Sequence, residues 1–236
     1  MSAPYRFAMA DDCLSCPLKR NSDFCSLLTE ALAGFSGSGY LSVFPSHVVL
    51  LTEGQVPRGV FVLCSGRAKI SAMARDGKQV ILKIAGERQV MGLSAVVSGR
   101  PSPVTVTTIE HCQVKFIESS SFLELVEHNG SAALACAVTL SRDVQAAFQG
   151  VHGLLLARSS TEKLARLLLS WVAQEPHNRD LRVATDFTHE EMAQMIGSSR
   201  ETVTRLLGDM KRRELIRLEG ATLVIPNRIA LQAIAA

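Results

Sequence analysis

Residues 188–213 read THEEMAQMIGSSRETVTRLLGDMKRR. Residues 188–191 have the Thr-x-x-Glu spacing of a capping box, which predicts the start of a short helix. Gly197 suits the turn that follows, and residues 198–201 form a second capping-box pattern that opens a longer helix. This order of helix, glycine-bearing turn and helix predicts a helix-turn-helix.

The second predicted helix has two distinct sides. Its apolar residues recur at the i, i+3, i+4 and i+7 spacing of a buried face: Val203, Leu206, Leu207 and Met210. The opposite side carries four polar residues near the start of the helix: Arg200, Glu201, Thr204 and Arg205. An arginine can bond guanine O6 and N7 together, and a glutamate can accept from the cytosine amino group. We therefore expect this side to read a G- and C-containing half-site in the major groove of double-stranded DNA.

Positive charge is concentrated in the same stretch. The whole chain of 236 residues has a net charge of only +3, which is low for a protein that binds nucleic acid through its bulk charge. Residues 198–213 contain five basic and two acidic residues, so this segment alone has a net charge of +3. The predicted DNA-contacting set is completed by residues at the two helix starts and near the end of the second helix: Thr188, Ser198, Ser199, Lys211 and Arg212.

The segments on either side extend this unit into a winged domain. Residues 159–162 form another capping box, which predicts a helix running to about Ala173. Residues 215–218 and 222–225 flank Glu219-Gly220, a pair that suits a β-hairpin turn and predicts a wing.

Composition excludes several classes of protein. Hydrophobic residues make up 47% and charged residues 20% of the chain, which excludes wholesale disorder. We find neither an apolar run long enough for a membrane-spanning helix nor a secretory signal at Met1, so we expect a cytoplasmic protein without a membrane partner. No Ser-His-Asp set, metalloprotease helix or phosphate-binding glycine loop is recognisable, so an enzyme is not expected.

The middle of the chain is rich in β-strand patterns and ends in a long helix. Within residues 27–130, short apolar runs alternate with glycine-bearing turns, and Asp76-Gly77 predicts a tight hairpin, as in a compact sandwich or roll. The predicted fold class is α+β. The predicted domains are an N-terminal cysteine segment (1–26), a β-roll sensor domain (27–130), a long dimerisation helix (131–157) and a C-terminal winged helix-turn-helix domain (158–236).

The long helix carries a heptad repeat. One heptad position holds Ala137, Val144 and Val151, and the other holds Leu140, Ala147 and Leu154. A repeat of 3.5 residues produces a seam for a partner helix, so a homodimer is expected. The alternative is an amphipathic helix that packs on its own β domain.

Residues 199–207, SRETVTRLL, closely resemble the recognition helix of the CRP/FNR family of transcription regulators. The resemblance covers nearly the whole chain. It implies a jelly-roll-like, cyclic-nucleotide-binding-like β-roll, a homodimer on a palindromic promoter site, and a contact with RNA polymerase. Arg200, Glu201 and Arg205 match the base-reading positions of the cyclic-AMP-receptor branch, which implies a TGTGA-like half-site.

The resemblance also identifies effector positions in the roll. In the cyclic-nucleotide branch a Gly-Glu pair binds the ribose and an Arg-Ser pair binds the cyclic phosphate. The corresponding places here are Gly92-Leu93 and Arg100-Pro101. Leucine cannot accept a ribose hydroxyl, and proline offers neither a hydroxyl nor a backbone N–H, so cyclic AMP is not expected to bind.

The six cysteines suggest that the protein responds to a signal other than cyclic AMP. Cys13, Cys16 and Cys25 lie together near the N-terminus, with the first two in a C-x-x-C-P pattern that suits one metal centre. Iron–sulfur members of the FNR branch have such a cluster plus one distant cysteine, so we expect an iron–sulfur cluster, of the 4Fe–4S type, that senses oxygen, nitric oxide or redox state. Cys112 is the predicted fourth ligand and Cys64 its competitor. A zinc site, a thiol switch, or a small organic effector without any metal remain open alternatives.

Overall fold

The computed structural model describes residues 39–157, 159–173, 182–184, 187–220 and 222–235. Cys13, Cys16 and Cys25 therefore lie outside the described residues. The chain divides into two compact units, one made of residues 1–72 and 83–144 and the other of residues 73–82 and 145–236. The domain limits predicted from the sequence differ from this division and stay a prediction.

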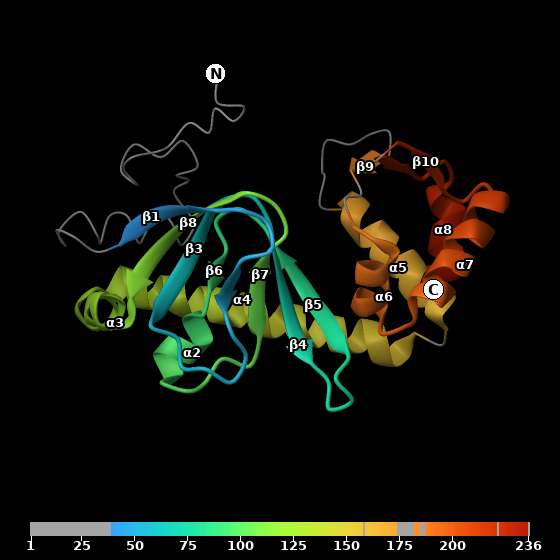
Figure 1. Ribbon diagram of the computed structural model, residues 1–236. Helices are drawn as coiled ribbons and strands as arrows, with labels where there is room; N and C mark the ends of the chain where they lie inside the picture. Colours follow the sequence, from blue (N-terminus) through green and yellow to red (C-terminus); the bar gives the residue numbers. More distant parts are fainter. Residues whose placement is uncertain (1–38, 158, 174–181, 185–186, 221, 236) are drawn as a thin grey trace, which may run out of the picture. The chain divides into compact units, whose positions relative to one another are not determined.

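Two four-stranded sheets make up the β-rich part of the chain (Figure 1). One has the order β1-β8-β3-β6, formed by Tyr40–Phe44, Cys112–Glu118, Gly59–Ser65 and Val90–Met91. The other has the order β2-β7-β4-β5, formed by Val49–Leu51, Thr105–Thr108, Ala68–Met73 and Gln79–Ala85. The hairpin predicted at Asp76-Gly77 joins β4 to β5, and Gly77 has the positive φ of 82° that this turn needs. The predicted β-rich roll is confirmed.

Alternation along β8 separates two apolar clusters. Cys112 and Val114 pack with Leu63 inside the roll, whereas Ile117 packs with Val60 on the other side of the same sheet. The second cluster is completed by three helices of the described residues: α2 (Leu93–Ser98), α3 (Ser119–His128) and the start of α4 (Gly130–Leu156). The roll is therefore a closed core with a helical cover on one sheet.

Gly59 allows β3 to pass close to β8. A Cβ at this position would overlap the carbonyl oxygen of Ile117 and would lie 2.7 Å from the ring of Phe116. We expect Gly59→Ala to lower the free energy of unfolding by about 1–3 kcal/mol or more, because backbone has to move to make room. Urea denaturation measures this change.

Gly86→Ala is the matched control. No heavy atom lies within 4 Å of a Cβ at Gly86, so this variant should stay within about 0.5 kcal/mol of the wild type. Equal denaturation midpoints for the two variants would contradict the predicted clash at Gly59.

Helix α4 has one buried and one exposed side along its first half. Ala132, Ala135 and Cys136 are buried in the cluster that covers the β1 sheet, and Leu140 packs against the same cluster. Leu140 is only partly buried by this contact, so its predicted place in an intersubunit seam stays a prediction. Among the described side chains of α4, the large exposed hydrophobic ones are Leu134, Val138, Val144, Phe148 and Val151.

The second unit packs helices against a small sheet. Helices α5 (Ser160–Ala173), α6 (His189–Ile196), α7 (Arg200–Arg212) and α8 (Arg228–Ala235) surround one buried cluster that includes Leu164, Val203 and Ile216. The sheet has the order β10-β11-β9, formed by Arg217–Glu219, Thr222–Val224 and Arg182–Ala184. The predicted wing is confirmed as β10 and β11, while β9 and α8 were not predicted.

Among the described residues, none of the helices combines the length and apolar character that crossing a membrane requires.

Candidate nucleic-acid interface

Hydrogen bonds at the helix starts define the helix-turn-helix. The Thr188 hydroxyl accepts from the Glu191 backbone N–H at 3.1 Å, and the Glu191 carboxylate accepts from the Thr188 N–H at 3.0 Å. These two bonds complete the predicted capping box of α6. Gly197 ends α6 with a φ of 62°, a left-handed conformation that few residues other than glycine adopt readily.

The start of α7 differs from the prediction by one residue. Ser199, rather than Ser198, is the N-cap, and its hydroxyl accepts from the Thr202 N–H at 3.2 Å. Because the helix begins at Arg200, Glu201 is its second residue and cannot close the predicted capping box. The Ser198 hydroxyl lies 3.5 Å from that of Ser160 at the start of α5.

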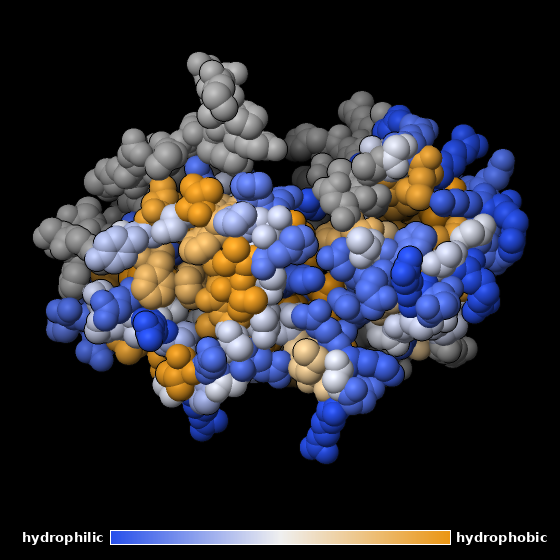
Figure 2. Space-filling model, viewed as in Figure 1, coloured by the Kyte–Doolittle hydropathy of each residue, from blue (hydrophilic) through white to orange (hydrophobic). Residues whose placement is uncertain are grey.

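The two predicted sides of α7 are present. Val203, Leu206, Leu207 and Met210 are all buried in the core of the second unit. Arg200, Glu201, Thr204 and Arg205 are all exposed. Hydrophilic side chains gather over the part of the second unit that contains α7 (Figure 2). The surface of α7 therefore offers two guanidinium groups and one carboxylate close to the helix N-terminus.

Glu201 is held in its charged form. Its own backbone N–H at the start of α7, the Ser199 hydroxyl and the nearby Arg200 charge all lower the pKa of this carboxyl below its usual value. A carboxylate that stays ionised can accept hydrogen bonds but cannot donate them. This state suits an acceptor for the cytosine amino group.

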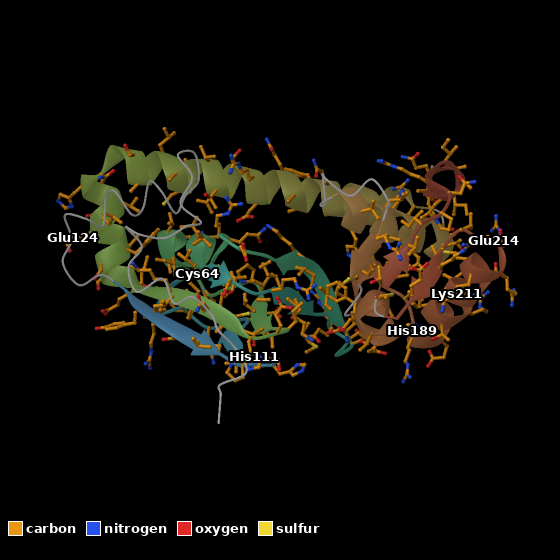
Figure 3. All side chains as sticks on the ribbon, turned by 90° about the horizontal axis from the view of Figure 1, so that it is seen from above. Cys64, His111, Glu124, His189, Lys211 and Glu214 are labelled. Atoms are coloured by element: carbon orange, nitrogen blue, oxygen red, sulfur yellow. The ribbon has the colours of Figure 1, made fainter. Side chains whose placement is uncertain are left out.

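Ion pairs occupy part of the basic surface. Arg212 pairs with Asp209 one turn earlier in α7, and Arg182 of β9 pairs with Glu219 of the wing. Lys211 is exposed near the C-terminal end of α7, as Figure 3 shows. Lys211 is therefore better placed than Arg212 to offer its charge to a phosphate without first breaking a pair.

His189 has a role that the sequence did not reveal. The Nδ1 atom of His189 (labelled in Figure 3) lies 2.9 Å from the Thr204 hydroxyl, so this side chain links α6 to the exposed side of α7. The spacing of fifteen residues across a turn carries no local pattern that predicts such a contact.

Two family models match the two units. Residues 41–129 match the cyclic nucleotide-binding domain, and residues 162–234 match the Crp-like helix-turn-helix domain. The chain is 28% identical over 195 residues to the CRP-like cAMP-activated global transcriptional regulator of Mycobacterium tuberculosis, covering 80% of this chain and 86% of that protein. The chain belongs to the CRP/FNR family. It is a DNA-binding transcription regulator of that family and not an enzyme.

Solved structures of two bacterial proteins have the same fold as this chain. FixK2 from Bradyrhizobium japonicum superposes with a TM-score of 0.73 at 18% identity, covering 84% of this chain and 98% of that one. The c-di-GMP responsive global regulator CLP of Xanthomonas campestris gives a TM-score of 0.71 at 19% identity, covering 84% and 99%. At 18% and 19% sequence identity, the similarity shows only that these proteins share the fold.

The effector positions of this CRP/FNR member are poor in polar groups. Gly92 precedes α2 with a φ of 84°, and Leu93 is only 2% exposed within the apolar cluster under the helices. Arg100 and Pro101 are exposed. The Ser102 hydroxyl is already bonded to both backbone groups of Val104, at 2.8 and 3.3 Å. The expectation that cyclic AMP does not bind depends on these residues and stays a prediction.

The described cysteines differ in accessibility. Cys112 is fully buried inside the roll. Its thiol donates hydrogen bonds to the backbone carbonyl oxygens of Arg67 and Glu110, with sulfur–oxygen distances of 3.2 and 3.4 Å. Burial raises the pKa of this thiol, and burial also raises that of Cys136 to about 11. Cys64, at the end of β3, is only partly buried (Figure 3).

A cysteine binds a metal as its thiolate, and burial at Cys112 raises the pKa of the thiol; its role as the fourth cluster ligand stays a prediction. Among the residues that the structure describes, no group of three or more His, Cys, Asp or Glu side chains could hold a metal ion.

Proposed function

We propose that this CRP/FNR regulator acts as a cytoplasmic homodimer that places one α7 helix in each of two successive major grooves of a palindromic, TGTGA-like promoter site. The observation that carries this proposal is the separation of α7 into a buried apolar side and an exposed side with Arg200, Glu201 and Arg205. A contact with RNA polymerase is part of the same proposal.

The proposed interface contains residues that read bases and residues that contact the DNA backbone. Arg200 and Arg205 bond guanine O6 and N7, and the ionised Glu201 accepts from a cytosine amino group. The remaining members hold the DNA backbone, from the helix starts or from the basic end of α7: Thr188, Ser198, Ser199, Lys211 and Arg212.

DNA footprinting tests the dimeric arrangement. Two protected half-sites with centres about 34 Å apart, one helical turn, are expected. Protection of one half-site at saturating protein would contradict it.

The exposed side of α4 supports the homodimer. Val144, Phe148 and Val151 are exposed by 54%, 64% and 49%, and Ala137 and Ala147 are exposed on the same helix. A run of exposed apolar side chains over several helical turns suits a parallel partner helix. Leu140 and Leu154 are the other two predicted members of the seam; Leu140 also packs partly against its own domain, and the side chain of Leu154 lies outside those that the structure describes.

The proposed signal acts on an iron–sulfur cluster held by Cys13, Cys16 and Cys25. The composition of such a cluster would change with oxygen, nitric oxide or redox state. The partial exposure of Cys64 and the burial of Cys112 favour Cys64 as the fourth ligand.

Anaerobic purification tests the cluster. We expect iron and acid-labile sulfide in the wild type, a clear loss of both in Cys64→Ala, and retention in Cys112→Ala. A wild-type protein that is free of iron and sulfide would contradict the cluster, and loss only in Cys112→Ala would reverse the choice of fourth ligand.

A small organic effector in the roll, with zinc, a thiol switch or no metal at the cysteines, is the second candidate. The match to the cyclic nucleotide-binding domain favours it, as do relatives named cAMP-activated or c-di-GMP responsive. Because the effector positions lack the required polar contacts, we do not propose cyclic AMP as that effector. An iron-free protein whose DNA affinity changes when a small molecule is added would favour this candidate.

A further inference from the structure

Two hydrogen bonds fix the hydroxyl of Thr204. Thr204 Oγ1 donates to the carbonyl oxygen of Arg200 one turn earlier, at 2.9 Å, and lies 2.9 Å from Nδ1 of His189. A threonine hydroxyl has one hydrogen, and here the Arg200 carbonyl receives it. His189 must therefore be the donor, with its proton on Nδ1.

This arrangement changes what Thr204 can offer to DNA. Its hydrogen is already used, so the hydroxyl cannot donate to a guanine or thymine oxygen. The groups that remain are one lone pair and the Cγ2 methyl group. Thr204 is exposed and lies beside Arg205, on the side of α7 that carries the proposed base-reading residues.

A helical threonine without a further partner divides between two side-chain rotamers, because its hydroxyl can bond different backbone carbonyls. The bond from His189 favours one of them. His189 thus acts on Thr204 from a different helix and need not touch a base itself.

We propose that His189 is a positioning residue that orients Thr204 so that its methyl group faces the major groove and contacts the 5-methyl group of a thymine. The inference rests on the proposed base reading by α7. Contact between a threonine methyl and a thymine methyl is a recognised element of direct readout. It would place a specific thymine beside the bases that the two arginines read.

Replacing thymine by uracil tests the inference, because uracil lacks only the 5-methyl group. Each thymine of a selected palindromic site is replaced in turn, symmetrically in both half-sites, and the affinity is measured by fluorescence anisotropy. For the wild type, one position should lose roughly fourfold per half-site, the effect of one buried methyl group. Uracil tolerated at every position would overturn the proposal.

Four variants separate the methyl group from the hydroxyl. Thr204→Val keeps the methyl group and should keep the uracil effect, whereas Thr204→Ser should bind thymine and uracil sites equally. His189→Ala should reduce the uracil effect, and His189→Asn should restore it because its amide can donate to Thr204. A uracil effect that is unchanged in Thr204→Ser or in His189→Ala would also overturn the proposal.

The test is separable from the proposed function. If α7 reads bases but Thr204 does not contact a thymine methyl group, Arg205→Ala still loses specific affinity while uracil is tolerated everywhere. If α7 does not read bases, Arg205→Ala leaves specific affinity unchanged as well.

Discussion

Replacing Phe148 by glutamate is expected to convert the dimer into a monomer at micromolar concentration and to weaken binding to a palindromic site at least roughly 100-fold. Phe148 is 64% exposed on α4, so its removal leaves the described core intact, while a charge in an apolar helix seam is not tolerated. A monomer binds each half-site on its own. It therefore loses the gain in DNA affinity that comes from joining two DNA-binding units in one dimer, a gain that reaches about 10²–10⁴-fold. Analytical ultracentrifugation and anisotropy measure the two effects.

Gln149→Glu is the matched control, since it adds the same carboxylate to the next exposed residue of the same helix. It should remain dimeric and bind DNA like the wild type. If Phe148→Glu is also dimeric, α4 does not form the seam. If it is monomeric with unchanged affinity for the palindrome, dimerisation does not support DNA binding.

Replacing Arg205 by alanine is expected to cost about 1–3 kcal/mol per half-site on the preferred sequence and to remove the preference for guanine at one position. The exposed guanidinium offers two parallel donors, so Arg205→Lys should not restore the preference. Competition with sites substituted at each base measures both effects.

Arg213→Ala provides the comparison. Arg213 is exposed at the C-terminal cap of α7, away from the start of the helix, so its loss should affect all sequences similarly. If Arg205→Ala also weakens all sequences by the same factor, Arg205 contacts phosphate and does not read a base.

The recognition unit could be predicted from the sequence because its signals are local. The capping pair Thr188 and Glu191, the turn glycine Gly197 and the i, i+3, i+4, i+7 spacing beginning at Val203 each act within one or two turns of helix. The N-cap of α7 was misassigned because Ser198 and Ser199 both have the right chemistry, and packing of Ser198 near α5 is invisible in the sequence.

The choice of seam residues on α4 is open in the sequence for a different reason. Ala137, Val144 and Val151 fit a heptad repeat with either of two companion sets, one containing Leu140 and the other Leu134 and Phe148. Periodicity cannot tell which set faces the protein's own core, whereas in the structure Leu140 packs partly against that core. Long-range contacts likewise decided the burial of Cys112 and the bond between His189 and Thr204.

Selection of binding sites from random DNA by the purified protein, compared with Arg200→Ala and Arg205→Ala, tests base reading by α7 most directly. We expect a palindrome whose half-sites contain guanine and cytosine, and each arginine variant should lose its preference at a different position. A selected site without twofold symmetry, or variants that select the same sequence as the wild type, would contradict it.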